Sequence, residues 1–102
     1  MHVVDDDFDV RKSLGFLMAT ADLAVRLQES ATAFLTAAAD SLEGCIVSDA
    51  RMPGIDGIEF LGQLRSRGHT LPVVVMMGHA DVALAVQAMK EGAADFIEKP
   101  VQ

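Results

Sequence analysis

The chain has 102 residues, 51% of them hydrophobic, and this length predicts one domain that must order most of its residues to bury a core. Eight basic and fifteen acidic residues give a net charge of -7, and the absence of a Lys/Arg cluster argues against direct nucleic-acid binding. A single cysteine, no leader and no apolar run near the roughly 20 residues of a membrane span predict a cytoplasmic protein outside the membrane.

Short β-branched runs alternate with helix-period segments in the first half of the chain. A first strand is expected at about residues 1–4, and a helix follows to about Thr20, with Asp6 or Asp7 as its N-cap. The apolar positions of this helix are Val10, Leu14, Leu17 and Ala21. A second strand at about residues 24–28 then precedes a short Ala-rich helix from Ser30 to about Ala38.

The second half of the chain adds two strand–helix pairs and a last strand. A strand at about residues 45–48 ends at Asp49, and a helix begins at Asp56 and ends near Gly68. The next strand, residues 73–77, is apolar throughout and therefore expected inside the sheet. A helix from Asp81 to Gly92 should bury Val82, Ala85, Ala88 and Met89, and Phe96-Ile97 forms a short last strand. This order predicts an α/β fold, a doubly wound sheet of five parallel strands.

Charged residues follow three of the predicted strands at their carboxyl ends. Asp5 and Asp6 follow the first strand, Asp49 follows the third and Lys99 the fifth. Parallel strands place all these groups at one edge of the sheet, where open α/β folds bind ligands. A hard cation such as Mg2+ is usually held there by one or two carboxylates with phosphate oxygens. The sequence therefore predicts a site for a metal and phosphoryl chemistry.

The position of Asp49 suits a nucleophile. It stands alone, expected as an exposed acid, ahead of a turn in which Pro53 and Gly57 have structural roles, whereas the adjacent Asp5-Asp6 pair suits metal binding. A carboxylate beside a bound cation can attack a phosphoryl group and form an aspartyl phosphate. Lys99 can reach a phosphoryl oxygen, and Pro100 fixes the backbone behind it.

Three segments together resemble the receiver domain of bacterial two-component response regulators, in particular a FixJ-like subgroup. They read VVDD at residues 3–6, SDARMPGIDG at 48–57 and AMKEGAADFIEKP at 88–100, so the resemblance covers almost the whole chain and predicts one receiver domain, residues 1–102. It implies the flavodoxin-like receiver fold and phosphorylation of Asp49 by a sensor histidine kinase, with Mg2+ bound by Asp5, Asp6, Asp49 and the backbone carbonyl of Arg51. It also implies that Lys99 contacts the phosphoryl group, that Phe96 is a switch residue and that the bond before Pro100 is cis.

Two departures from the family pattern affect what the resemblance implies. Met77 stands where the family has a Ser or Thr whose hydroxyl hydrogen-bonds the phosphoryl group, and a thioether cannot donate that bond. The family also has a fifth helix after the last strand, whereas this sequence ends at Gln102. A sheet face without that helix would expose apolar surface, which predicts a homodimer or an exchange of elements between copies. The other reading is a C-terminally truncated fragment.

Three classes of function follow from these residues. The first is a phosphorylation-dependent switch, not an enzyme, that controls an output domain absent from this chain, with transcription as the expected output. The second is a phosphorylation-independent pseudo-receiver that acts as an interaction module, and Met77 favours it. The third is a metal-dependent phosphohydrolase, which usually carries a general acid two residues after its nucleophile. Arg51 occupies that position, which argues against the third class.

Overall fold

A computed structural model describes residues 1–37, 44–52, 54–78 and 82–98. Five parallel strands form one sheet in the order β2-β1-β3-β4-β5. The strands are β1 His2–Val4, β2 Arg26–Gln28, β3 Ile46–Asp49, β4 Val73–Met77 and β5 Asp95–Glu98. All five expected strands are therefore present in the expected chain order. The interior position of β4, between β3 and β5, is also confirmed.

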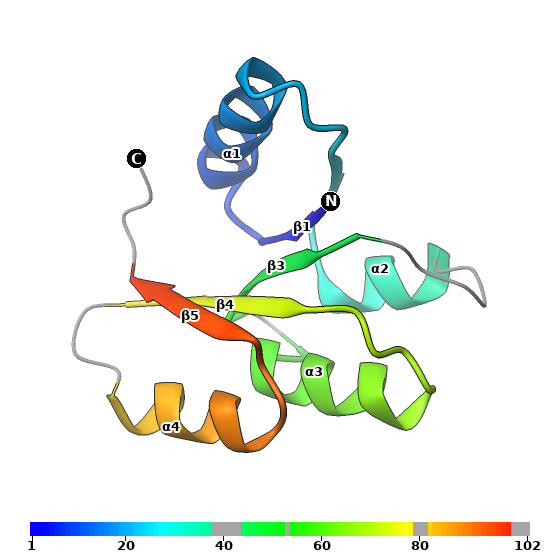
Figure 1. Cartoon of the computed structure of the whole chain (residues 1–102), viewed down its shortest axis with the longest axis vertical. Helices are drawn as coiled ribbons and strands as arrows, with labels where there is room; N and C mark the ends of the chain where they lie inside the picture. The colour runs from blue at the N-terminus through cyan, green and yellow to red at the C-terminus, as the bar shows by residue number, and fades with distance from the viewer. Residues whose placement is uncertain (38–43, 53, 79–81, 99–102) are drawn as a thin grey trace.

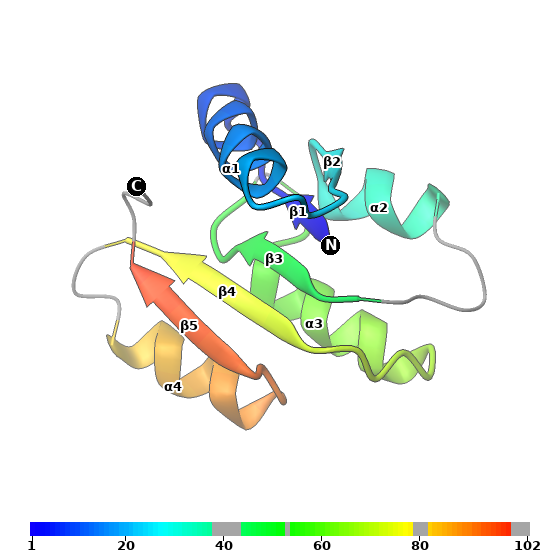
Figure 2. The same cartoon turned by 45° about the horizontal axis from the view of Figure 1, so that its top comes forward.

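Four helices in the described residues cover the two faces of the sheet. They are α1 Phe8–Thr20, α2 Ala31–Ala37, α3 Gly57–Ser66 and α4 Val82–Lys90. Figures 1 and 2 show α1 on one side of the sheet and α3 and α4 on the other. Buried side chains of α2, α3 and α4 belong to one hydrophobic cluster, and those of α1 belong to a second. The doubly wound architecture predicted from the sequence is confirmed.

The two hydrophobic clusters arise because successive strand residues point to opposite faces. Val4, Ile46 and Val75 contribute to the cluster under α2, α3 and α4. Their neighbours Val3, Val47 and Met76 contribute to the cluster under α1. The inner strand β4 is apolar in every position because helices cover both of its faces, as is typical of parallel sheets.

Two aspartates fix the start of the helices that flank the carboxyl edge. Asp7 is the N-cap of α1, and its Oδ1 accepts a hydrogen bond from the backbone N–H of Asp9 at 2.8 Å. Asp56 is the N-cap of α3 and accepts from the N–H of Glu59 at 2.8 Å. Both caps satisfy backbone donors that a helix leaves without an internal partner.

Several expectations about burial and element ends are wrong. Leu17 of α1 and Met89 of α4, both predicted to face the core, are each 44% exposed. Periodicity identifies the apolar side of a helix but not how much of that side its neighbours cover. Cys45, expected inside the third strand, is only partly buried and precedes β3. The second strand begins at Arg26, two residues later than expected.

The order of the strands predicts a ligand crevice at the carboxyl edge of the sheet. From β1 the sheet extends through β2 in one direction and through β3, β4 and β5 in the other. In an open α/β sheet, ligands bind outside the carboxyl ends of the strands at this reversal. The segments after β1 and β3 therefore border the crevice. Within the described residues, no helix combines the length and apolar character that a membrane span requires.

Candidate metal and phosphoryl site

Three carboxylates meet at the predicted edge of the sheet. One carboxylate oxygen from each of Asp5, Asp6 and Asp49 lies within 4.8 Å of the other two. Asp5 and Asp6 follow β1, and Asp49 is the last residue of β3, which pairs with β1. The sequence prediction that these side chains converge is confirmed by this geometry.

The chain holds Asp5 in place from two directions. Its backbone N–H donates to the carbonyl of Gln28 at the end of β2, at 3.1 Å, so the loop continues the sheet. Its Oδ1 accepts a hydrogen bond from the N–H of Asp7 at 2.8 Å. Asp5 is fully buried, whereas Asp6 is exposed. The pair therefore offers one fixed carboxylate and one that faces solvent.

Asp49 is less accessible than the sequence suggested. It was expected to be exposed, but only 7% of its surface reaches solvent. It lies inside β3 rather than after it, opposite Met76 of β4, and the N–H of Ala50 donates to the Met76 carbonyl at 2.7 Å. The following N–H, that of Arg51, donates to Asp49 Oδ1 at 3.4 Å. Backbone pairing on β4 thus restricts where the Asp49 carboxylate can point.

Gly57 lies at a close contact between the start of α3 and the end of β3. A Cβ atom at this position would overlap the carbonyl oxygen of Asp49 and lie 2.8 Å from the Cα of Ala50. The N–H of Gly57 also donates to the carbonyl of Ala50 at 2.8 Å. Only glycine lets the start of α3 approach the end of β3 this closely. The requirement here is space, because Gly57 has no positive φ angle.

The other residues predicted for the site differ in their burial and in their position on the strands. Arg51 follows β3 and is exposed. Met77 ends β4 and is only 2% exposed, and its side chain belongs to the cluster beneath α3 and α4. Phe96 lies on β5 opposite Val75 and is 40% exposed. Pro53, Lys99 and Pro100 lie outside the described residues, as does His79.

Two contributions to this region were not recognised in the sequence. Arg11 of α1 extends back to the loop, where its Nη1 donates to the carbonyl of Asp5 at 2.7 Å, and its guanidinium lies 5.7 Å from the ring centroid of Phe8. Ser48 is fully buried, and its hydroxyl donates to the Asp49 carbonyl at 3.1 Å. Arg11 follows the N-cap Asp7 by one helical turn. This spacing could have indicated from the sequence that the Arg11 side chain reaches back to the loop after β1.

The three carboxylates fit a hard divalent cation. Two oxygens bound to one Mg2+ can be at most about 4.2 Å apart, so a small side-chain rotation from the observed limit of 4.8 Å would suffice. An all-oxygen donor set with several negative charges suits Mg2+ and gives no soft ligand for zinc or copper. The exposed Asp6 leaves one side of such an ion open to water or to phosphate oxygens.

Comparison with known proteins agrees with this geometry. The family model "Response regulator receiver domain" matches residues 1–102. The chain is 57% identical to the transcriptional regulatory protein FixJ of Azorhizobium caulinodans over 100 residues, which covers 98% of this chain and 47% of the relative. It is 47% identical to the C4-dicarboxylate transport transcriptional regulatory protein DctD of Pseudomonas aeruginosa, covering 96% of this chain and 21% of the relative.

Solved structures give the same result. The crystal structure of FixJ-N superimposes with a TM-score of 0.91 at 48% identity, covering 99% of this chain and 81% of that one. A full-length FixJ from B. japonicum also gives a TM-score of 0.91, with 50% identity, and the match covers 99% of this chain and 50% of that one. The chain thus spans about half the length of the FixJ proteins that it matches.

Proposed function

The chain belongs to the response regulator receiver domain family, and we propose that it is a phosphorylation-dependent signalling switch that accepts a phosphoryl group on Asp49. The observation that supports this most is the meeting of Asp5, Asp6 and Asp49 at the β1/β3 reversal. A structural role alone does not require three carboxylates at one point, because like charges at this distance repel. Receiver domains are signalling proteins, and the chain is proposed to be a switch rather than an enzyme.

We assign different roles to the three acids. Bound Mg2+ would neutralise the cluster and the incoming phosphoryl oxygens, so that a carboxylate can act as nucleophile. Asp5, Asp6, Asp49 and the carbonyl of Arg51 would hold the ion. Asp49 is the proposed nucleophile because it stands alone at the end of β3, whereas the adjacent Asp5 and Asp6 are better suited to hold the ion. Its attack on phosphorus would form the aspartyl phosphate and release the donor as leaving group.

Lys99 and Phe96 complete the proposed switch. Lys99, the residue after β5 in the sequence, would neutralise a phosphoryl oxygen, because its ammonium is a compact charge on a flexible stem. Phe96 would be the residue that responds, since it is partly exposed beside α4 and therefore has room to change its position. The added charge on Asp49 would then alter the surface formed by α4 and β5.

A phosphorylation-independent pseudo-receiver remains the alternative, and one observation favours it. Met77 has its side chain in the core cluster and has no hydroxyl to reach toward the carboxylates. The chain could then keep the fold and bind partners without using phosphate. The intact set of Asp5, Asp6 and Asp49 favours the switch, because a pseudo-receiver has no need to retain the acids.

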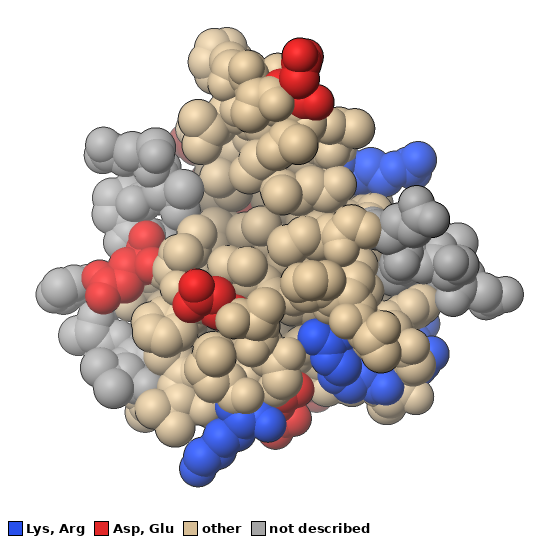
Figure 3. All heavy atoms as spheres, viewed as in Figure 1, with Lys and Arg blue, Asp and Glu red and all other residues tan. Residues whose placement is uncertain are grey.

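Partners follow from the proposed switch. A sensor histidine kinase would donate the phosphoryl group, and the output would be a transcription regulator of the kind named among the relatives, outside residues 1–102. Nucleic acid would be contacted only through such a region. Figure 3 shows that charged side chains lie mostly around the margins of the face that carries α1 and β5. Leu17 and Ile97 are exposed, so we also propose association of two copies, measurable by light scattering at several concentrations.

Intact mass spectrometry tests the phosphorylation. The chain would be incubated with a small-molecule phosphodonor, with and without Mg2+, beside an Asp49→Asn variant and an Asp56→Asn control. A single labile phosphoryl adduct that requires Mg2+ and Asp49 but not Asp56 supports the switch. If a folded sample gains no phosphoryl adduct, the pseudo-receiver becomes the better-supported function.

A further inference from the structure

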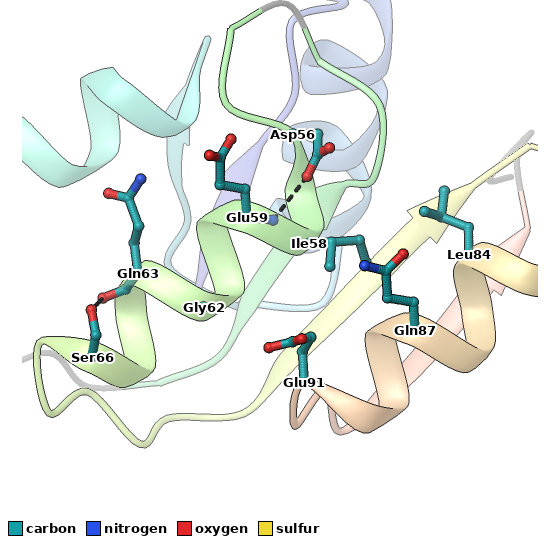
Figure 4. A pocket seen from close by; sticks show the side chains of 9 residues that line it. All are labelled: Asp56, Ile58, Glu59, Gly62, Gln63, Ser66, Leu84, Gln87 and Glu91. Carbon is teal, nitrogen blue, oxygen red and sulfur yellow. Dashed lines mark hydrogen bonds between the residues drawn. The ribbon is translucent and has the colours of Figure 1, made fainter.

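A groove of about 580 Å³ lies between α3 and α4 on the outer side of the molecule. Figure 4 shows side chains of both helices along its two walls. The residues that determine its chemistry are Asp56, Ile58, Glu59, Gly62, Leu84 and Glu91. The three carboxylates at the β1/β3 reversal do not line it. The groove is therefore separate from the proposed phosphoryl site.

Two apolar side chains lie inside the groove, among the neutral polar side chains of Gln63, Ser66 and Gln87. Ile58 is buried and Leu84 is partly buried, and both pack against the core cluster. Gly62 lies one helical turn after Ile58 in the wall formed by α3, and a Cβ atom added there would meet nothing within 4 Å. Backbone is thus accessible in the middle of a helix, where glycine costs about 1 kcal/mol relative to alanine. The groove has space for aliphatic side chains of another molecule.

The rim of the groove is acidic. Asp56 and Glu59 stand at the start of α3, and Glu91 stands just after the end of α4. All three are exposed, and none of the described residues that line the groove is Lys or Arg. The rim therefore carries three negative charges that the lining does not compensate. A nucleic acid or another anionic ligand would be repelled, and a cationic partner would be attracted.

We propose that this groove docks an amphipathic helix of a partner protein, with aliphatic side chains on the face that enters the groove and Lys or Arg beside them. α3 has ten residues, about 15 Å of helix, which matches two to three turns of a partner. Aliphatic anchors would contact Ile58, Leu84 and the backbone of Gly62, and the cations would face the rim. Helix-in-groove binding of this kind combines apolar contacts with charge complementarity that sets orientation and association rate. The contact is small and therefore transient.

The test uses a designed 14-residue helical peptide of Leu and Lys, and a matched peptide in which Glu replaces Lys. Each would be titrated into the ¹⁵N-labelled chain while backbone NMR shifts are recorded. The Leu/Lys peptide should shift residues of α3 and α4 around the groove, and its affinity should fall as salt is raised from about 0.1 M to about 1 M. The Leu/Glu peptide should leave these residues unchanged.

Three variants separate the groove from general attraction to an acidic protein. Glu91→Lys should weaken Leu/Lys binding about tenfold, because one attraction becomes a repulsion, whereas Glu29→Lys makes the same charge change outside the groove and should leave affinity within about twofold. Gly62→Leu keeps every charge but fills the groove, and should abolish the shifts. The spectrum of each variant reports whether it is folded.

Shifts spread over the whole acidic surface, or equal losses in Glu91→Lys and Glu29→Lys, would overturn the proposal. Unaltered binding by a folded Gly62→Leu variant would also contradict it. Concentration-dependent groove shifts without any peptide would assign the surface to a second copy of the chain instead. None of these readouts requires phosphorylation, so the result is independent of the proposed switch.

Discussion

Gly57, the first residue of α3, lies so close to the carbonyl oxygen of Asp49 that a side chain at position 57 would overlap it. The same glycine donates its N–H to the carbonyl of Ala50 at 2.8 Å. The end of β3 and the start of α3 are therefore joined by direct backbone contact. Any residue larger than glycine must displace one of them, and with it the Asp49 carboxylate.

Gly57→Ala should lower both stability and phosphorylation. Forcing a methyl group into this contact costs about 1–3 kcal/mol of unfolding free energy, and the shift in Asp49 should slow formation of the phosphoryl adduct. Urea denaturation and mass spectrometry with a phosphodonor would measure the two effects. Gly62→Ala is a matched control in the same helix, since its Cβ meets nothing within 4 Å, and it should be neutral or stabilising by up to about 1 kcal/mol. Equal behaviour of the two variants would exclude the backbone contact as the cause.

Mg2+ should raise the melting temperature of the chain. A ligand that binds only the folded state at ten times its dissociation constant adds about 1.4 kcal/mol, which is several degrees for a domain of this size. Asp6→Asn should reduce the shift, because it removes the exposed acid of the cluster without opening the core. Differential scanning calorimetry at several Mg2+ concentrations would measure the rise in melting temperature of the unmodified chain and of the Asp6→Asn variant.

Asp22→Asn gives a charge-matched control for the Mg2+ experiment. Asp22 has a φ of 60°, a conformation that asparagine also tolerates, so one negative charge is removed without backbone strain. Its Mg2+ shift should equal that of the unmodified chain. A shift reduced equally in both variants would mean that Mg2+ responds to net charge and not to the cluster.

Much of this arrangement could be predicted from the sequence, and the rest depended on contacts between distant segments. Alternating apolar runs and helix caps indicated five strands and four helices, and strand ends placed Asp5, Asp6 and Asp49 together. The burial of Asp49 could not be predicted from the sequence, because it results from the pairing of β3 with β4 and from the close approach of Gly57. The exposure of Leu17 could not be predicted either, since the spacing of apolar residues does not show which other elements cover a helix.

Arg65 should contribute strongly to stability although it lies far from the carboxylates. Its Nη1 donates to the carbonyls of His69 and Leu71 at 3.0 and 3.1 Å, and its Nη2 donates to the carbonyl of Gly92 at 3.2 Å. It thereby ties the end of α3 to the turn between α4 and β5. Arg65→Met should cost about 2–4 kcal/mol, as expected for several charge-assisted bonds.

The exposed Arg67 provides the comparison for Arg65. Arg67→Met removes the same charge two residues later without touching these three bonds, and should change stability by less than about 0.5 kcal/mol. Urea denaturation of both variants measures the difference. A similar loss in the two would show that charge, rather than the bridge to Gly92, determines stability here.

Met77→Thr should strengthen the response of Phe96 to phosphorylation. Met77 ends β4 with its side chain in the core, so the unmodified chain lacks a hydroxyl that could move toward a phosphoryl group. A threonine there would supply a donor that is better satisfied after phosphorylation, which couples Asp49 to the neighbouring β5. Aromatic NMR signals of Phe96, compared before and after phosphorylation, measure the response.

Val73→Thr is the matched control for Met77→Thr, because it introduces the same hydroxyl on the same face of β4, four residues before the carboxyl edge and away from Phe96. Both variants bury a hydroxyl and lose packing, so each should cost about 2–4 kcal/mol of unfolding free energy. Only Met77→Thr should enlarge the phosphorylation-dependent change at Phe96, since only position 77 adjoins the crevice. If the unmodified chain already shows a change as large as that of Met77→Thr, the hydroxyl is not the coupling element. The signal would then reach Phe96 by another route.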